Sequence, residues 1–251
     1  MAQSDAADGH EGLVDGDVHH YDSASEMPAN IQKYWHQRHD LFSRYDEGVR
    51  LTDAAWFGVT PEAVAHRIAA DIALAAPPDA KTIIDLFAGA GGNTIALALS
   101  GRWEQIFAIE RDAATLECAK HNARLYGVEN RIWFIHGDCF DVVRKRLKGV
   151  VKDAVLFGSP PWGGPGYRDE EVFDLLRMEP YGIEALAGEL ESLGRGYVLY
   201  LPRSSDLNQI AAWKDRLGGQ EGKKLRVTHY CMRGASKALC VFYGDFQFEG
   251  T

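Results

Sequence analysis

An unusual loop sequence, SPPW, stands in the second half of the chain at Ser159, Pro160, Pro161 and Trp162, directly after an apolar run. The prolines exclude a helix and are poorly tolerated in a central strand, so we expect a rigid loop just past a strand. A serine hydroxyl and a proline carbonyl could accept hydrogen bonds from an amino group, while the indole stacks on a flat ring. The loop therefore suits chemistry on the exocyclic amine of a planar base. A purely structural turn is the alternative interpretation.

A glycine-rich motif, DLFAGAGGNT, occupies residues 85–94. It has the strand, turn and helix start that bring a ligand against backbone amides at a helix N-terminus. Its glycines do not follow the dinucleotide pattern G-x-G-x-x-G, and no phosphate-binding lysine follows them. The motif favours S-adenosylmethionine, with a tight packing turn as the alternative. The residues of this motif that we expect to contact the cofactor are Asp85, Ala88, Gly89, Gly91, Asn93 and Thr94.

Acidic residues follow the next two predicted strands. Glu110 lies about 20 residues beyond the glycines, at the place where a carboxylate can accept hydrogen bonds from ribose hydroxyls. Asp112 is predicted to cap the following helix instead. Asp138, at the tip of the third strand, could accept a hydrogen bond from an adenine amino group. An acid at a strand end is usually only solvent-exposed, but its register with the glycine turn favours binding here.

The elements that would position these residues alternate between strand and helix. Helices are predicted over residues 31–42 and from Thr60, as N-cap, and Pro61 up to the Pro77–Pro78 pair. Repeated strand–helix units predict an α/β fold with a doubly wound parallel sheet, in which the SPPW loop lies at the switch point. Strands are expected at 82–88, 105–110, 131–138, 153–161 and 196–203, and a closing hairpin at 225–246.

Composition narrows the class of protein further. The chain has 251 residues and a formal charge of −9, but residues 1–27 contain seven of its 36 acidic residues and none of its 27 basic ones. We predict that this acidic segment is disordered. The nearly neutral remainder is unsuited to coating a long duplex. The sequence predicts no signal peptide, membrane span or metal site, and its four cysteines favour a cytosolic or nuclear protein with reduced thiols.

The chain resembles the methyltransferase domain of the trimethylguanosine synthase family over most of residues 31–247. The resemblance rests on KYWHQRHDLFSRYDEGVRL, WFGVTPE, DLFAGAGGNTIALAL, SPPWGGPGY, YLPR and FYGDF. It implies a Rossmann-like class I fold that depends on S-adenosylmethionine and has a small N-terminal helical lobe. It also implies methylation of guanine N2 in 7-methylguanosine caps, giving 2,2,7-trimethylguanosine on small RNAs (snRNA and snoRNA). Ser159 favours this family, because other amine methyltransferases commonly place Asp or Asn there, whereas Glu110 stands where an Asp is common.

The same resemblance assigns further residues. Ser159, Pro160 and Trp162 would be catalytic, and Ser159 would also contact the cofactor. Phe57 and Thr60 would close over the cofactor, and Trp162 would stack on the cap. The cap triphosphate would contact Arg50, Tyr167, Arg203 and, more weakly, Lys237. The resemblance further implies a monomer in the nucleus (nucleolus), and possible presence in the cytoplasm, with small ribonucleoprotein proteins as possible partners.

The predicted domains are a tail at 1–27, a helical lobe at 28–76 that completes both pockets, and a methyltransferase core at 77–251. Two alternatives stay open. One is a methyltransferase for internal guanine N2 or adenine N6 in nucleic acid, which would need a longer basic track. The other is a cap-binding module without activity, against which the intact glycine turn, Glu110 and Ser159 argue.

Overall fold

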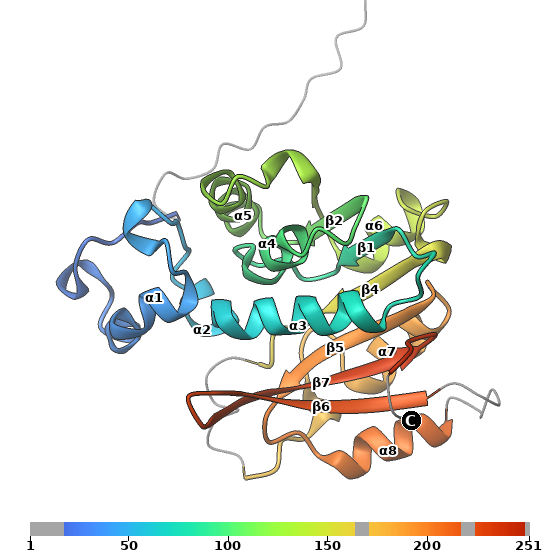
Figure 1. Ribbon diagram of the computed structural model, residues 1–251. Helices are drawn as coiled ribbons and strands as arrows, with labels where there is room; N and C mark the ends of the chain where they lie inside the picture. Colours follow the sequence, from blue (N-terminus) through green and yellow to red (C-terminus); the bar gives the residue numbers. More distant parts are fainter. Residues whose placement is uncertain (1–17, 164–170, 217–223, 249–251) are drawn as a thin grey trace, which may run out of the picture.

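A seven-stranded sheet forms the centre of the computed structural model, which describes residues 18–163, 171–216 and 224–248 (Figure 1). The strand order is β3-β2-β1-β4-β5-β7-β6. Strands β3 to β5 in this order are parallel, and β7 is antiparallel to both β5 and β6. The predicted doubly wound sheet with a closing hairpin is therefore confirmed. The strands are β1 (Thr82–Asp85), β2 (Gln105–Glu110), β3 (Ile132–His136), β4 (Ala154–Gly158), β5 (Gly196–Pro202), β6 (Lys224–Met232) and β7 (Ala235–Gly244).

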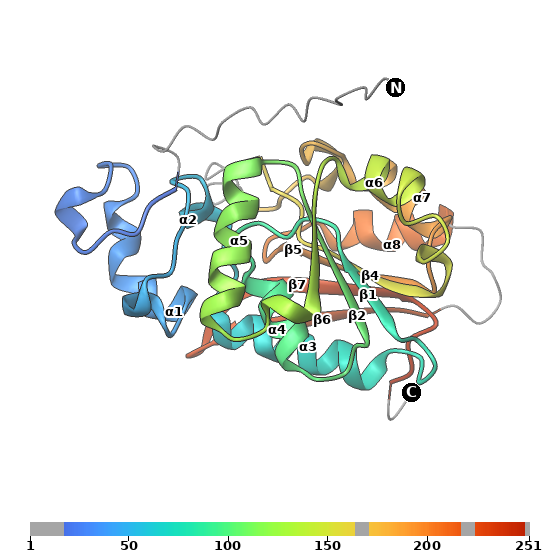
Figure 2. The same ribbon diagram turned by 90° about the horizontal axis from the view of Figure 1, so that it is seen from above.

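Helices cover both faces of this sheet, with α3, α4 and α5 on one face and α6, α7 and α8 on the other (Figure 2). Alternate residues of β4 and β5 enter two separate cores: Phe157 and Val198 face the first, Leu156 and Leu199 the second. Burial on both faces explains why these strands read as continuous apolar runs. The helices of the core are α3 (Glu62–Ala75), α4 (Gly92–Leu99), α5 (Ala113–Leu125), α6 (Cys139–Lys145), α7 (Ile183–Glu191) and α8 (Leu207–Arg216), with 3₁₀ turns at Glu129–Arg131, Val151–Asp153 and Leu175–Arg177.

The N-terminal lobe consists of short turns, and the single helix predicted over residues 31–42 is wrong. Gln32–Gln37 is a 3₁₀ helix, and only Arg38–Leu41 (α1) is α-helical. Ile31 and Tyr34 are both buried and three residues apart, a spacing that matches the three-residue turn of a 3₁₀ helix. The lobe also contains 3₁₀ turns at Ala24–Glu26 and Tyr45–Glu47 and the short helix α2 (Ala55–Gly58).

The predicted tail boundary at residue 27 lies too late in the chain. His19 pairs with Leu51 in an antiparallel bridge, with both N···O distances 2.9 Å. Tyr21 and Met27 are buried, and the Tyr21 amide donates to the hydroxyl of Tyr45 at 3.2 Å. These apolar side chains give the segment enough buried surface to pack, which its acidic composition obscures. Residues 1–17 of the predicted tail lie outside the described residues.

The start of α3 also differs slightly from the prediction. The helix begins at Glu62 with Pro61 at its N-cap, one residue later than expected, and Thr60 does not cap it. The Thr60 hydroxyl instead accepts a hydrogen bond from Asn93 Nδ2 at 3.0 Å. This contact ties the lobe to the glycine-rich turn. In the part of the chain that the structure describes, no helix is both long and apolar enough to cross a membrane.

Candidate active site

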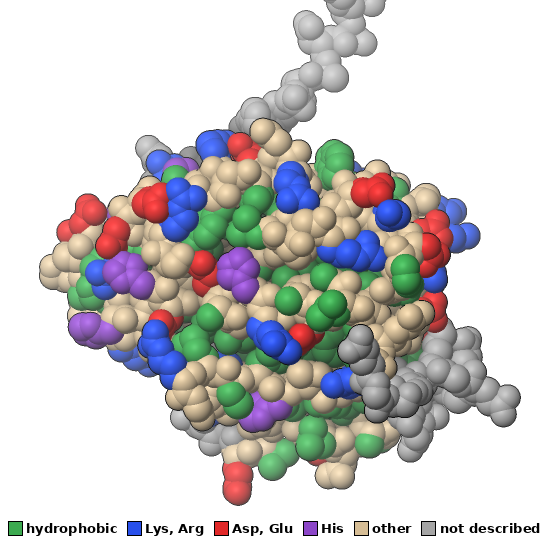
Figure 3. Space-filling model, in the orientation of Figure 1, with side chains coloured by type: hydrophobic (Ala, Val, Ile, Leu, Met, Phe, Trp, Pro, Cys, Tyr) green, Lys and Arg blue, Asp and Glu red, His purple; other side chains and the backbone are tan. Residues whose placement is uncertain are grey.

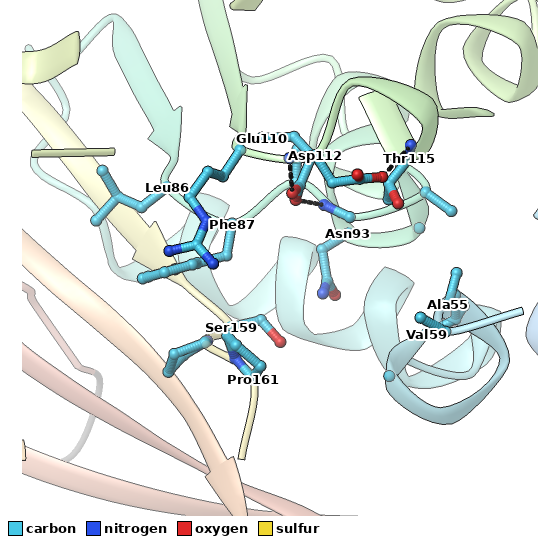
Figure 4. Close-up of a pocket in the computed structure, with 18 of the residues that line it drawn as sticks. Ala55, Val59, Leu86, Phe87, Asn93, Glu110, Asp112, Thr115, Ser159 and Pro161 are labelled. Carbon is cyan, nitrogen blue, oxygen red and sulfur yellow. Dashed lines mark hydrogen bonds between the residues drawn. The ribbon is translucent and has the colours of Figure 1, made fainter. Parts of the chain in front are cut away.

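A pocket of about 480 Å³ lies at the carboxyl ends of β1, β2 and β4 (Figure 4). Strand order reverses between β1 and β4, and ligands of open α/β sheets bind in the crevice at such a point. The volume falls in the range of about 300–1,000 Å³ that is typical of small-molecule sites. Besides the glycine-rich turn and the SPPW loop, the lining residues come from the lobe (54, 55 and 57–60), from segments 110–112 and 137–139, and from Thr115 and Pro180.

The glycine-rich turn forms the floor of the pocket. Ala88, Gly89 and Asn93 line it, as the sequence predicted. Gly89 and Gly91 have φ angles of 53° and 95°, which side chains rarely adopt. Gly91 does not line the pocket; a Cβ there would lie 3.2 Å from the Ala119 backbone, so this glycine lets α4 and α5 pack closely.

Asp85 and Thr94 lie beneath this floor, not in the pocket lining. Asp85 is fully buried, and its carboxylate accepts hydrogen bonds from the Thr94 hydroxyl at 2.6 Å and from the Phe87 amide at 3.3 Å. The prediction that these two side chains contact the cofactor directly is therefore wrong. Both side chains lie below the turn, where their hydrogen bonds hold its backbone in place. Burial outweighs those two bonds and raises the pKa of Asp85 to about 7.

Glu110 holds the turn from the side. Its carboxylate accepts the Gly89 amide and the Asp112 amide, each at 2.9 Å. Each carboxylate oxygen keeps a second lone pair, so Glu110 can still accept a hydroxyl from a ligand in the pocket. Asp112 caps α5 by accepting the Thr115 amide at 2.7 Å, as predicted. Figure 4 shows Glu110, Asp112 and Thr115 along one side of the cavity.

Asn93 lines the pocket and holds a polar atom without a partner. Its Nδ2 donates to Thr60, but its Oδ1 is buried and has no hydrogen-bond partner among the described residues. Figure 4 shows the amide directed toward the space between Ser159 and Val59. A buried polar atom without a partner costs about 1–3 kcal/mol, so a ligand donor that reached this oxygen would remove that cost. The α-amino group of S-adenosylmethionine is such a donor, and the pocket fits this cofactor.

Asp138 lines the pocket as predicted, and its carboxylate is already well supported. One oxygen caps α6 by accepting the Phe140 and Asp141 amides, both at 3.1 Å. The other accepts the Tyr181 hydroxyl at 2.5 Å. Partial burial alone would raise the pKa of Asp138, but the hydrogen bonds from Tyr181 and the two amides outweigh it and lower the pKa.

The SPPW loop forms the wall opposite Glu110. Ser159, Pro160, Pro161 and Trp162 all line the pocket, so the loop comes next to the glycine-rich turn as the sequence predicted. The Trp162 indole stacks on Tyr200 with ring centroids 5.4 Å apart and an interplanar angle of 25°. Its Nε1 donates to the Tyr200 carbonyl at 3.3 Å. Tyr200 therefore fixes the plane and the rotation of the indole.

The lobe closes the remaining side of the pocket. Phe57 and Thr60 line it as predicted, together with Ala54, Ala55 and Val59. The lobe is held in place partly by Asn122 of α5, which is fully buried. Its amide bonds both backbone groups of Arg50 and donates to the Ala90 carbonyl of the glycine-rich turn at 3.0 Å.

The residues predicted to bind the cap triphosphate do not line this pocket. Arg50 and Arg203 are exposed, and Lys237 is half-buried on β7. Tyr167 lies outside the described residues. Figure 3 shows one face of the molecule, on which Lys and Arg side chains are interspersed with acidic and apolar ones and form no continuous basic track. This face offers no support for an enzyme that follows a long internal duplex.

Sequence reasoning missed several residues of the site. Tyr200 belongs to the YLPR motif, and its position three residues before Arg203 was a usable signal. Arg111 also lines the pocket, and its place directly after Glu110 in the sequence was a second signal. Pro180, Tyr181 and Asn122 had no recognisable signal, because their contacts join segments that are far apart in the sequence. The described residues contain no cluster of His, Cys, Asp or Glu that could hold a metal ion.

Fold and pocket together define the class of protein: a Rossmann-like methyltransferase that depends on S-adenosylmethionine. Two solved structures share the fold. They are a putative methyltransferase from Porphyromonas gingivalis (TM-score 0.61, 17% identity, 88% of this chain and 54% of that one) and an S-adenosylmethionine-dependent methyltransferase from Agrobacterium tumefaciens (TM-score 0.52, 17% identity, 75% and 63%).

Sequence comparison then gives the family. The model of the RNA cap guanine-N2 methyltransferase family matches residues 80–246. The trimethylguanosine synthase of Schizosaccharomyces pombe is 35% identical over 218 residues, which cover 86% of this chain and 87% of that protein. The synthase of Saccharomyces cerevisiae is 33% identical over 240 residues, covering 94% and 75%. The chain belongs to the RNA cap guanine-N2 methyltransferase family.

Proposed function

We propose that this enzyme methylates N2 of 7-methylguanosine caps on small RNAs, snRNA and snoRNA, to give 2,2,7-trimethylguanosine. One observation carries the proposal: the indole of Trp162, backed by Tyr200 at 5.4 Å, lies beside Ser159 on the wall of the pocket whose floor is the glycine-rich turn. A stacked base and a bound methyl donor would therefore meet at the same point of the sheet.

Different residues of the pocket would bind different parts of the cofactor. S-adenosylmethionine supplies the methyl group. Asn93 Oδ1 would accept its α-amino group, because this buried oxygen has no partner among the described residues. Glu110 would accept the ribose hydroxyls, and Asp138 the adenine amino group, each with the lone pairs that its backbone partners leave open. Phe57 would cover the cofactor from the lobe.

The SPPW loop would hold the acceptor amine. The Ser159 hydroxyl and the Pro160 carbonyl accept hydrogen bonds from N2, which directs its lone pair toward the methyl group. Proximity and orientation of this kind can contribute about 7–11 kcal/mol. The carboxylates of the pocket already accept hydrogen bonds from backbone amides; they are Glu110, Asp112 and Asp138. This supports binding roles for them, and the proposed mechanism uses no strong general base.

Cations outside the pocket would contact the cap triphosphate. Arg203 directly follows β5, three residues after Tyr200, which contacts Trp162. Both Arg203 and Arg50 are exposed. A guanidinium can bind phosphate oxygens in a bidentate manner. Lys237, half-buried on β7, is the weaker candidate, and Tyr167 is assigned by family resemblance alone.

The experiment compares three acceptors with S-adenosylmethionine that carries a labelled methyl group: a 7-methylguanosine cap dinucleotide, an unmethylated cap and uncapped RNA. We expect label only on the first at low enzyme concentration, and mass spectrometry should show two added methyl groups. Ser159→Ala should lower kcat while cofactor affinity is retained. Label on uncapped RNA at a comparable rate would favour the enzyme for internal bases, and cap binding without label would favour the silent module.

The cellular setting is part of the proposal. Small nuclear and nucleolar RNAs as substrates place the enzyme in the nucleus, with small ribonucleoprotein proteins as its partners, and a monomer would suffice because one chain provides the whole pocket. Tagged protein, imaged and then purified with its RNA, tests this. Recovery of messenger RNA in place of trimethylated small RNA would contradict it.

A further inference from the structure

A second hollow, of about 660 Å³, lies on the edge of the sheet away from the hairpin, and we call it the β3 groove. It shares no lining residue with the pocket of the active site. Strand β3, the outer strand of the sheet, supplies much of one wall, and the end of α6 continues it. The lining residues are Phe107, Lys120, Glu129, Asn130, Ile132, Trp133, Phe134, Ile135, Arg146 and Leu147.

An aromatic pair dominates this groove. Trp133 is 49% exposed, which is unusual for the largest apolar side chain. Its ring stacks on Phe107 of the neighbouring strand, with centroids 5.3 Å apart and an interplanar angle of 27°. Phe107 therefore holds the indole flat at the surface. Such a ring is a platform on which another flat ring can stack.

Cations surround the aromatic pair. Arg146 and Lys120 line the groove, and Arg131 and Lys148 stand next to lining residues in the sequence. The one carboxylate of the lining, Glu129, is paired with Arg124 at 2.6 Å. Lys120 pairs with Glu117 at 2.5 Å, whereas Arg146 and Lys148 have no ion pair with any described residue. In a chain with a net charge of −9, this combination of free cations and an exposed indole is a local exception.

We infer that the β3 groove is a second RNA-binding site, which stacks a base from the single-stranded body of the capped substrate on Trp133. Arg146 and Lys120 would contact the flanking phosphates. Aromatic platforms with nearby cations are the general means of binding single-stranded RNA without reading its sequence. The inference rests on RNA being the substrate.

The arrangement of the sheet is compatible with one RNA chain reaching both sites. Trp162, which would stack on the cap, follows β4, and β4 is three strands away from β3 in the sheet. At about 4.8 Å per strand, this is about 14 Å across the sheet, and Trp133 lies three residues before the end of β3, which is about 10 Å along the strand. A peptide added to the free edge of β3 is the competing occupant. It would bind through backbone groups and would depend little on the indole or on the Arg146 charge.

The test uses capped single-stranded RNAs of about 5, 10 and 20 nucleotides, which bracket the usual site sizes. We expect kcat/KM of the natural enzyme to rise with RNA length. Trp133→Ala should bind an uncapped fluorescent oligonucleotide about 5- to 100-fold more weakly, as expected for one lost base stack. Trp133→Phe should restore most of the affinity. Arg146→Gln should reduce the slope of log affinity against log salt by about 0.7.

Two controls separate this inference from the proposed function. Leu74→Ala changes an 84% exposed apolar residue on α3, far from β3 in the fold, and should leave RNA affinity unchanged. The cap dinucleotide is too short to reach the groove, so its kcat/KM should be the same in all variants. Failure of the natural enzyme on the dinucleotide would contradict the proposed function alone. Unchanged oligonucleotide affinity in both Trp133→Ala and Arg146→Gln would overturn the β3 groove as an RNA site.

Discussion

The side-chain amide of Asn122 satisfies both backbone polar groups of Arg50. Asn122 Oδ1 accepts the Arg50 amide at 2.8 Å, and Nδ2 donates to the Arg50 carbonyl at 2.9 Å. The same Nδ2 donates to the Ala90 carbonyl at 3.0 Å. One buried residue of α5 therefore joins the lobe to the glycine-rich turn. This bridge sets how the lobe wall closes the pocket, and where the chain presents the Arg50 side chain.

We expect Asn122→Ala to leave these backbone groups without partners. Each unsatisfied buried group costs about 1–3 kcal/mol, so the free energy of unfolding should fall by several kcal/mol. Asn122→Asp should be comparably harmful, because a carboxylate would face two carbonyl oxygens. At a temperature where the variants stay folded, KM should rise for cofactor and cap together. Asn208→Ala, at an exposed position on α8, is the matched control. An unchanged melting temperature and unchanged KM values in Asn122→Ala would contradict the bridge.

A second prediction concerns the support of Asp138 by Tyr181. Tyr181→Phe keeps the ring, which packs edge-on against Phe140 at 5.0 Å, and removes only the hydroxyl that donates to Asp138 at 2.5 Å. Cofactor affinity should fall several-fold, while the KM for the cap stays the same. Because this hydrogen bond helps to lower the pKa of Asp138, its loss should raise that pKa.

The pH profile distinguishes this effect from simple loss of packing. Asp138 must be ionised to accept hydrogen bonds fully, so cofactor affinity is lost as the pH falls through its pKa. In Tyr181→Phe this acid limb should move to higher pH. Calorimetric titration of S-adenosylmethionine from pH 8 down to pH 3 measures it. An affinity loss that is the same at every pH would mean that Tyr181 acts through packing alone.

The buried acid Asp85 gives a third prediction, on stability. Burial raises its pKa to about 7, against an unfolded value near 3.9. The folded state therefore binds the proton more tightly. The stability that this proton provides is fully present below about pH 4 and is lost as the pH rises to about 7, by at most about 1.4 kcal/mol per pH unit.

Asp85→Asn removes this titration. The amide oxygen can still accept the Phe87 amide, and the amide nitrogen can donate to the Thr94 hydroxyl. We expect the free energy of unfolding of the variant, relative to the natural protein, to be greater at pH 8 than at pH 5. Urea unfolding at the two pH values measures the difference. Equal differences at pH 5 and pH 8 would show that Asp85 stays ionised in the fold.

The sequence was sufficient for the doubly wound sheet and for the two motifs that meet at the pocket. Motifs such as the glycine-rich turn and the SPPW loop carry their own backbone requirements, and parallel strands bring their carboxyl ends together. The sequence was insufficient for the lobe, where tertiary contacts of Tyr21 and Ile31 override local pattern. It also assigned Asp85 and Thr94 to the cofactor, although their bond to each other places them under the turn. A sequence motif does not show whether a side chain lines a pocket or lies beneath it.

The last prediction concerns how Trp162 selects its base. The ring is held by Tyr200 through stacking at 5.4 Å and through the bond from Nε1 to the Tyr200 carbonyl. A 7-methylguanine ring is cationic, and a cation over an indole gains about 0.5–2 kcal/mol over a neutral ring. Trp162→Ala should lose about 1–3 kcal/mol of cap binding and leave cofactor affinity nearly unchanged.

The unmethylated cap supplies the decisive comparison, because it keeps the triphosphate and loses only the positive charge of the base. The unmethylated cap loses the cation–π attraction and the contacts that complement the charge. We therefore expect about 2–4 kcal/mol less transition-state binding, which lowers kcat/KM by tens to several hundredfold. Tyr200→Ala should reduce this discrimination, since the indole is no longer held in plane, whereas Tyr200→Phe should retain it through stacking. Comparable kcat/KM values for the two caps in the natural enzyme would contradict recognition of the charge by Trp162, and would favour a methyltransferase that accepts guanine N2 generally.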